Sequence, residues 1–195
     1  MLGIVGLLGA LGGAALYLAV DRQRIATLVR EGEFRFDVFT EEEAIDALVA
    51  LGEWGGIGLA AAGVSIVLIG IAVVVTHERA RHDGRGTPRW ILGVVGAIIN
   101  VVFGFVPFSP ILGGAAASHL SSDFRGNGIA TGTFAGLFTI LPAFVGFSSV
   151  SVGLFTGLPG GTAAVAVALL VIAGMFAMAY IVGLSALGGY LGSRI

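Results

Sequence analysis

The sequence contains no cysteine and no lysine, and it has few charged residues of either sign. Without cysteine, disulfides, thiol nucleophiles and thiolate metal sites are excluded. Without lysine, a phosphate loop of the GK[ST] type, a Schiff base and a catalytic lysine are excluded as well. Charged residues make up 11% of the chain, and none occurs between Ile129 and Ser193. Soluble domains carry about 25%, so the composition points away from that class.

Apolar residues take the place of the missing charges. Hydrophobic residues make up 56% of the 195-residue chain, and the mean hydropathy is +1.01. A soluble domain of this size exposes a large share of its surface, so it cannot hide that much apolar area from water. A lipid bilayer is the solvent that suits such a chain. The sequence therefore predicts an all-α fold, a polytopic helical bundle in a cell membrane.

Long apolar runs predict the individual spans. A helix needs about 20 residues to cross a bilayer, at about 1.5 Å per residue. We expect four full spans, at residues 2–20, 55–76, 129–147 and 162–191, with an uncharged connection at 148–161. These spans divide the chain into an N-terminal two-span region, 1–89, and a C-terminal membrane domain, 90–195.

The only sizeable water-facing segment is the acidic stretch 21–53. Helical spacing continues from the first span to Gly32, which predicts that this helix projects out of the membrane. Residues 33–38 alternate in a strand-like pattern. Thr40 and Glu43 have capping-box spacing, which predicts a short amphipathic helix before Trp54, the interfacial anchor of the next span. Its acidic face suits packing on protein better than on anionic lipid.

The stretch FVPFSPILGG, residues 105–114, interrupts the apolar run that begins at Trp90. Thr87 and Pro88 resemble the N-cap and first position of a helix, which we expect to end at Val106. Pro107 then lacks an N–H group and clashes one turn back, and Pro110 favours an extended residue before it. We expect a short helix over 111–120 after a structural turn made of Pro107, Phe108, Ser109 and Pro110. Two geometries compete for 90–120: one kinked crossing, or a hairpin that re-enters from one side.

Arginine placement favours the hairpin. A hairpin puts the basic loop 77–89, Arg125 and Arg194 on one side, whereas a single crossing splits them. The positive-inside rule then makes the N-terminus and loop 77–89 cytoplasmic and the segment 21–53 external.

A break at membrane depth leaves unpaired carbonyl groups, which protein or a wet cavity must cover. The residues after the break, 113–118, are all small, and glycines recur four apart on the following span. Small residues let helix backbones approach closely, so these two surfaces are expected to pack together: Gly113, Gly114, Gly128, Gly132 and Gly136. The tripeptide LGG also recurs at 11–13, 112–114 and 187–189, as a weak internal repeat or by coincidence.

The turn residues resemble those of a family of small, uncharacterised multi-pass membrane proteins from haloarchaea. The shared pattern is an apolar helix, a turn of the FxPFSPxLGG type and a run of small residues, and it covers about residues 93–195. This chain has Ser118 and His119 where members commonly have a Gly-Tyr pair. The resemblance implies a membrane domain and brings no activity, cofactor or reaction with it.

Few side chains in the apolar spans can do chemistry. Asn100 is the only carboxamide there and is expected to form an interhelical hydrogen bond, or else to line a polar pathway. His119 lies near Asp123 and suits an interfacial histidine or a pH sensor. His77 and His82 are five residues apart, which does not align two imidazoles on a helix face, so no metal site is expected.

These observations favour a protein that is not an enzyme and needs no cofactor. The first hypothesis is a scaffold or accessory subunit of a membrane assembly, with the lipid bilayer and either a second copy or another membrane protein as partners. The alternative is a channel or facilitator for a small solute, with the re-entrant turn as its filter. A membrane enzyme ranks last because no nucleophile has a base near it in sequence. No basic patch with aromatic residues supports nucleic-acid binding.

Overall fold

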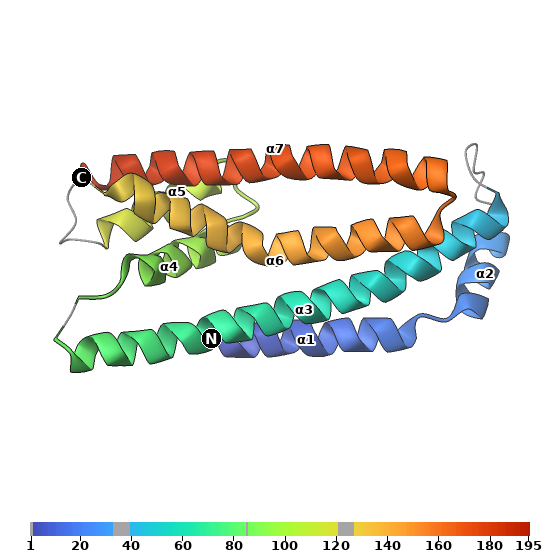
Figure 1. Cartoon of the computed structure of the whole chain (residues 1–195), viewed down its shortest axis with the longest axis horizontal. Helices are drawn as coiled ribbons and strands as arrows, with labels where there is room; N and C mark the ends of the chain where they lie inside the picture. The colour runs from blue at the N-terminus through green and yellow to red at the C-terminus, as the bar shows by residue number, and fades with distance from the viewer. Residues whose placement is uncertain (1, 33–39, 85, 121–126) are drawn as a thin grey trace. The chain divides into compact units, whose positions relative to one another are not determined.

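A computed structural model of the chain describes residues 2–32, 40–84, 86–120 and 127–195. These residues form seven α-helices (Figure 1). Four of them are long and apolar enough to cross a membrane. The expected all-α, polytopic helical class is therefore confirmed. The expected strand-like pattern at 33–38 lies outside the described residues.

The first helix, α1 (Leu2–Ala19), matches the expected first span. The expectation that it continues to Gly32 is wrong, because the chain becomes extended at Asp21 and a second helix, α2 (Arg22–Glu31), begins. The Asp21 carboxylate accepts hydrogen bonds from the N–H groups of Gln23 and Arg24, which makes Asp21 an N-cap. Gly32 does end α2, and its N–H group donates to the Leu28 carbonyl.

The third helix, α3 (Glu41–His82), has 42 residues without interruption. Its start is the expected capping box: the Thr40 N–H donates to Glu43 at 2.8 Å, and the Glu43 N–H donates to Thr40 Oγ1 at 3.3 Å. The expected separation into a short amphipathic helix and a span from residue 55 is wrong. Glycines near Trp54 are weak helix formers but no proline stands there, so the helix continues through them.

Two short helices follow, α4 (Arg89–Val102) and α5 (Ser109–His119). Pro88, rather than Thr87, is the N-cap of α4. The helix ends four residues before the expected Val106. A helical turn reaching Pro107 would push the proline ring against the Phe103 carbonyl, and Gly104 weakens the helix at the same place.

The last two helices are α6 (Gly128–Gly157) and α7 (Gly160–Gly192). The expected connection at 148–161 is wrong, because α6 continues through most of it. The hydroxyl groups of Ser148, Ser151 and Thr156 each donate to the carbonyl four residues earlier, at 2.8–3.0 Å. Their polar groups are thereby satisfied inside the helix, so uncharged serine-rich sequence does not mark a loop here.

The chain divides into two compact units. Unit 1 comprises residues 1–68 and 144–174, and unit 2 comprises residues 69–143 and 175–195. In unit 1, α1 and α3 pack through glycines on both helices. A Cβ atom added at Gly13 would lie 2.6 Å from the Gly56 carbonyl oxygen, and one added at Gly56 would lie 2.7 Å from the Tyr17 nitrogen. Only glycine permits this backbone approach, as in other membrane helix pairs.

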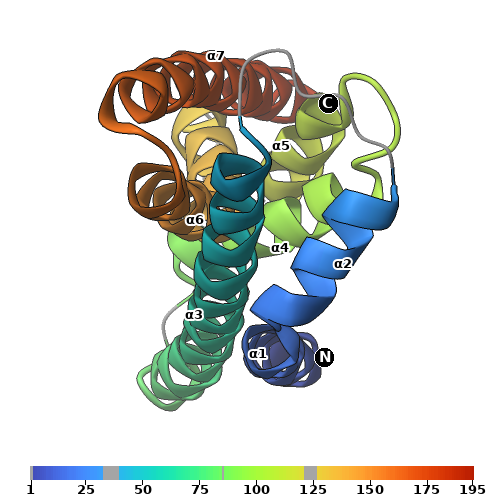
Figure 2. The ribbon, with the colours of Figure 1, turned by 90° about the vertical axis from the view of Figure 1, so that its right-hand side faces the viewer.

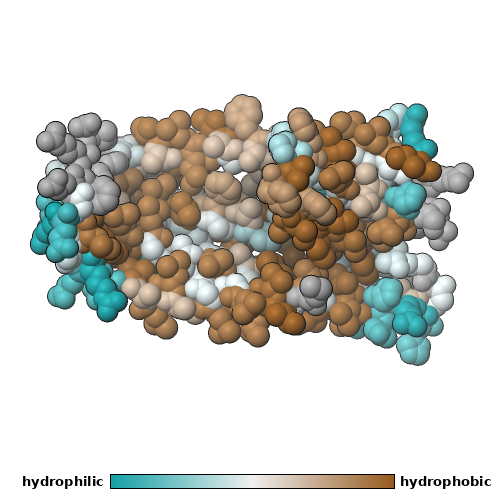
Figure 3. Space-filling view, turned by 180° about the vertical axis from the view of Figure 1, so that it is seen from behind, coloured by the Kyte–Doolittle hydropathy of each residue, from teal (hydrophilic) through white to brown (hydrophobic). Residues whose placement is uncertain are grey.

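The long helices present apolar side chains outward. Within the most apolar window of each of the four long helices, only 6–11% of the residues are buried. Leu18 of α1 and Phe176 of α7 are 80% and 73% exposed, and hydrophobic residues dominate the visible surface (Figure 3). A soluble protein rarely tolerates such patches, so these surfaces suit contact with lipid.

Candidate functional site

The best candidate site is the helix break in unit 2, where α4 and α5 form a hairpin. The two helices pack antiparallel: Gly96 lies against Gly113 and Ala117, and Asn100 lies against Gly113. A Cβ atom added at Gly96 would be 2.6 Å from the Gly113 carbonyl oxygen. The chain therefore reverses direction over residues 103–108.

The turn is closed by four short-range backbone hydrogen bonds. The N–H groups of Gly104, Val106, Ser109 and Ile111 each donate to the carbonyl three residues earlier, at 2.8–3.2 Å. Pro110 stands in the first turn of α5, where an N–H group is not needed. Within the part of the chain that the structure describes, no hydrogen bond reaches the main-chain carbonyls of Asn100 and Gly104.

Phe108 adopts an unusual backbone conformation at this turn. Its φ angle is 66°, in the left-handed region, and it is the N-cap of α5. A bulky side chain there is uncommon and costs about 1–2 kcal/mol. Phe108 is 58% exposed, and Phe105 is 82% exposed. Two exposed aromatic residues thus lie where the chain reverses.

A pocket of about 510 Å³ opens at the break, and we call it the break pocket. The turn forms one side, and Thr139 of α6 and Tyr180 of α7 contribute to the other. The lining is mainly apolar and includes no charged residue. Its members are Asn100, Val101, Gly104, Phe105, Val106, Pro107, Phe108, Ser109, Pro110, Thr139, Ala177, Tyr180 and Ile181.

Asn100 links three helices. It is 3% exposed, and its Nδ2 group donates to Thr139 Oγ1 at 2.9 Å and to Ser185 Oγ at 3.2 Å. These are the interhelical bonds expected of a lone carboxamide in apolar helices. Its Oδ1 atom has no hydrogen-bond partner among the described residues. A buried acceptor without a donor is rare enough to need a reason.

The small residues after the break pack differently from the sequence expectation. Gly113 lies against α4, whereas Gly114 lies against Ser185 and Gly189 of α7. The glycines of α6 also face α7: a Cβ added to any of them would meet atoms of residues 181–193, and this holds for Gly128, Gly132 and Gly136. The two surfaces therefore share α7 as a neighbour, rather than covering each other.

Several residues of this site escaped sequence reasoning. Ser185 is fully buried and accepts the Asn100 bond, and Gly188, Gly189 and Gly192 form the face of α7 that receives α5 and α6. The signal for them was the third LGG tripeptide, at 187–189, which spacing alone could not connect to the break. His119 is exposed at the end of α5. Its expected neighbour Asp123 lies outside the described residues.

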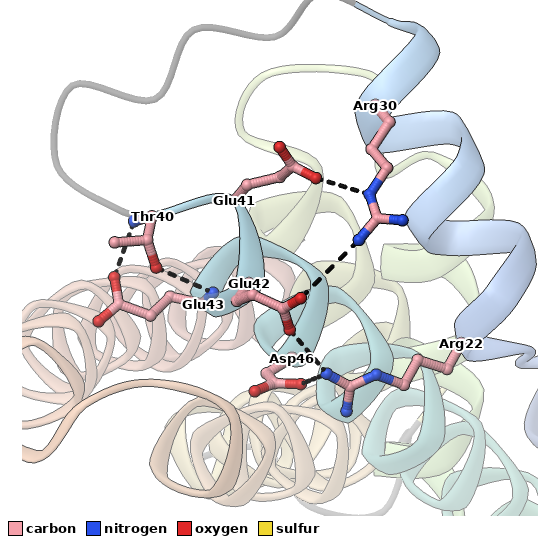
Figure 4. A network of polar contacts seen from close by, with 7 residues as sticks. All are labelled: Arg22, Arg30, Thr40, Glu41, Glu42, Glu43 and Asp46. Carbon is pink, nitrogen blue, oxygen red and sulfur yellow. Dashed lines mark hydrogen bonds and ion pairs between the residues drawn. The ribbon is translucent and has the colours of Figure 1, made fainter.

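A second polar cluster lies in unit 1, where α2 stands beside the start of α3 (Figures 2 and 4). Arg22 pairs with Asp46 at 2.7 Å and with Glu42 at 3.2 Å. Arg30 pairs with Glu41 at 2.7 Å, and the hydrogen bond and charge of Glu41 raise the pKa of Arg30. We call this set of ion pairs the α2–α3 clasp. It holds α2 against the first turns of α3.

The comparisons with known proteins identify a family for the C-terminal half. Residues 90–195 match a family of unknown function (DUF5518), and the match begins at the second residue of α4. The searches of curated proteins and of solved structures returned no match. The expectation of an uncharacterised family is thereby confirmed, and the chain belongs to this family of unknown function, DUF5518.

Proposed function

We propose that this protein is a non-catalytic, multi-pass membrane protein that serves as a scaffold or accessory subunit of a membrane assembly. Four long apolar helices with little internal burial support the membrane location. The α2–α3 clasp carries the scaffold role, because it presents a preformed charged element beside apolar helices. A docking element that is already ordered loses less entropy when a partner binds.

The charge of this element indicates the partner's chemistry. Segment 21–53 has nine acidic side chains against four arginines, and the clasp already occupies Arg22 and Arg30. We take the charged side chains left for a partner as its docking surface. They are mostly acidic and include Glu31 and Glu53, which are both exposed. Such a surface suits a basic segment on a neighbouring membrane subunit, either a second copy or another protein.

The proposed orientation follows the arginines, with the N-terminus and loop 77–89 in the cytoplasm and segment 21–53 outside. In this arrangement the α4–α5 hairpin enters and leaves the bilayer on the cytoplasmic side. An acidic, lysine-free chain also fits a high-salt organism, as the resemblance to haloarchaeal proteins implies.

The scaffold role is tested by chemical cross-linking in native membranes, followed by sizing of the complex. Changing Glu31→Gln together with Glu53→Gln should lower the yield of the cross-linked complex several-fold, because both exposed carboxylates leave the docking surface. The matched control is Glu78→Gln, an exposed glutamate near the other end of α3, which should leave the yield unchanged. A wild-type protein that runs as a lone monomer in its own membranes contradicts the proposal.

The break pocket supports a second candidate, a facilitator for a small solute. Beside the cavity, the carbonyl groups of Asn100 and Gly104 accept no hydrogen bond from the described residues. Exposed carbonyl groups at a helix break can line a pathway through a bilayer. Full-length protein in liposomes should then show solute flux that the double change Pro107→Ala and Pro110→Ala abolishes. Absence of flux from the wild-type protein removes this candidate and leaves the scaffold.

A further inference from the structure

Helix packing in unit 2 brings several arginines to one end of the unit. The end of α3 is joined to the start of α4 by the short connection 83–88. Because α4 and α5 run antiparallel, the start of α4 lies beside the end of α5, and Gly192 near the end of α7 packs against Ser118 of α5 (Figure 1). These three helix ends carry four described arginines, which we call the basic end: Arg79, Arg81, Arg89 and Arg194.

The basic end carries more positive charge than unit 2 neutralises. Over the whole unit the sequence has six arginines against three acidic residues. Arg79 and Arg81 are exposed, and neither forms an ion pair with a described residue. Arg194 lies over the ring of Tyr190, 4.4 Å from its centroid, and this contact does not neutralise its charge. The excess is available to an anion from outside the chain.

The basic end stands at the border of the apolar surface of unit 2. The apolar run of α3 ends at Val75, one helical turn before the first of these arginines. Trp90 directly follows Arg89 and is half-buried, and Tyr190 contacts Arg194. Tryptophan and tyrosine favour the headgroup level of a bilayer. In a membrane, the guanidinium groups are therefore level with the lipid phosphates.

We propose that the basic end binds the headgroup of an anionic phospholipid. Guanidinium groups donate paired hydrogen bonds to phosphate oxygens. An anionic headgroup also supplies the net negative charge that the basic end needs, whereas the ammonium group of phosphatidylcholine cancels the charge of its own phosphate. This inference rests on the membrane location in the proposed function and not on the scaffold role, because the docking surface belongs to unit 1.

The probe is phosphatidylglycerol, mixed as a minor component into phosphatidylcholine nanodiscs that hold the full-length protein. Mass spectrometry of the lipids retained on the protein after detergent extraction measures the enrichment of phosphatidylglycerol over its share of the bilayer. The wild type should show enrichment. Arg79→Gln and Arg81→Gln should each lower it about fivefold, the effect of one arginine near a charged membrane surface.

Two control variants separate binding at the basic end from other effects. Arg24→Gln removes the same charge from an exposed site on α2 of unit 1 and should preserve the enrichment. The double change Arg79→Lys and Arg81→Lys keeps the charge at the basic end and should retain most of the enrichment. All of these variants should leave the cross-linking yield of the scaffold test unchanged, so the two proposals can fail separately.

Four outcomes would overturn the proposal. Equal retention of the two lipids by the wild type shows no preference for an anion. An equal loss of enrichment in Arg24→Gln shows a response to the total charge of the chain. A complete loss in a folded lysine variant shows that the substitutions act through structure. Displacement of the retained lipid by excess glycerol phosphate shows a site for a soluble phosphate instead of a lipid.

Discussion

At the scale of single residues, the hairpin depends on glycines, which have no side chain to keep the two helices apart. Gly96 and Gly113 let two helix backbones touch, and a Cβ on either one would overlap the other helix. The one large polar group in this tight contact, the Asn100 carboxamide, then has room to reach Thr139 and Ser185. The glycine packing and the Asn100 hydrogen bonds are therefore linked, because the space left by the glycines accommodates the carboxamide.

The first prediction concerns Gly113. In Gly113→Ala the new Cβ would overlap Asn100 Oδ1 and the Gly96 carbonyl, and we expect a loss of about 1–3 kcal/mol, as for other overpacked sites. The measurement is the free energy of unfolding in mixed detergent micelles. Gly183→Ala on α7, where an added Cβ meets no atom within 4 Å, is the control and should not destabilise the protein. Equal stability of the two variants would show that α4 and α5 separate in solution.

The second prediction concerns the bond between Asn100 and Ser185. A double-mutant cycle with Asn100→Ala and Ser185→Ala should give a coupling energy of about 0.6 kcal/mol, typical of interhelical hydrogen bonds in membranes. Ser148, whose hydroxyl bonds to the Phe144 carbonyl of its own helix, provides the control cycle with Asn100 and should give none. Coupling of the same size in both cycles would mean that the energy does not come from this bond.

At the scale of helices, the sequence predicted where helices exist better than where they end. The first and last spans and the reversal after α4 were expected, because long apolar runs and paired prolines act locally. The lengths of α3 and α6 were missed for a physical reason. Glycines near Trp54 and serines near Ser149 look like loop formers, but tertiary contacts hold both stretches helical: Gly58 lies against Ser149, and Gly153 against Trp54.

Tertiary contacts also explain why the sequence predicted only part of the candidate site. Pro107 and Pro110 predicted the turn, but the pocket is also lined by Thr139, Ala177 and Tyr180. Those residues come from helices whose neighbours depend on the three-dimensional packing of α6 and α7. No spacing within one helix encodes which face meets the turn, so the pocket could not be found from the sequence.

The third prediction concerns the α2–α3 clasp. Its side chains are 48–69% exposed, so each pair contributes at most about 1 kcal/mol and is screened by salt. Arg22→Gln with Arg30→Gln should raise amide hydrogen exchange across α2, and 1 M salt should have the same effect on the wild type. Arg24→Gln is the control, because among the described residues the Arg24 side chain pairs only with Asp21, at 3.9 Å, and exchange should stay near the wild-type rate. Unchanged exchange in the double variant would show that apolar contacts of α2 are sufficient.

At the scale of the whole molecule, the absence of cysteine allows the membrane topology to be mapped with single introduced thiols. Any single thiol introduced into it is the only thiol present. Glu53 and Arg81 are both exposed residues of α3, and they stand on opposite sides of its apolar stretch. Labelling at these two positions therefore reports the direction in which α3 crosses the bilayer.

The fourth prediction is that Glu53→Cys reacts with a membrane-impermeant maleimide on intact cells, whereas Arg81→Cys reacts only after lysis. The physical reason is the positive-inside rule applied to loop 77–89. The reaction at each position is measured by the shift in immunoblot mobility after treatment with maleimide-polyethylene glycol. The reverse pattern would place the clasp in the cytoplasm, together with any partner that it binds.

The uninterrupted course of α3 has an electrical consequence. Its first turn carries Glu41, Glu42 and Glu43, and its last turn carries Arg79, Arg81 and His82. The helix thus bears opposite charge at its two ends. The resting potential of a cell, negative on the cytoplasmic side, contributes about 2.3 kcal/mol for each elementary charge moved across 100 mV. That voltage favours insertion with the arginine end of α3 inward. Collapsing the membrane potential with an ionophore during biosynthesis should therefore increase the fraction of chains inserted backwards.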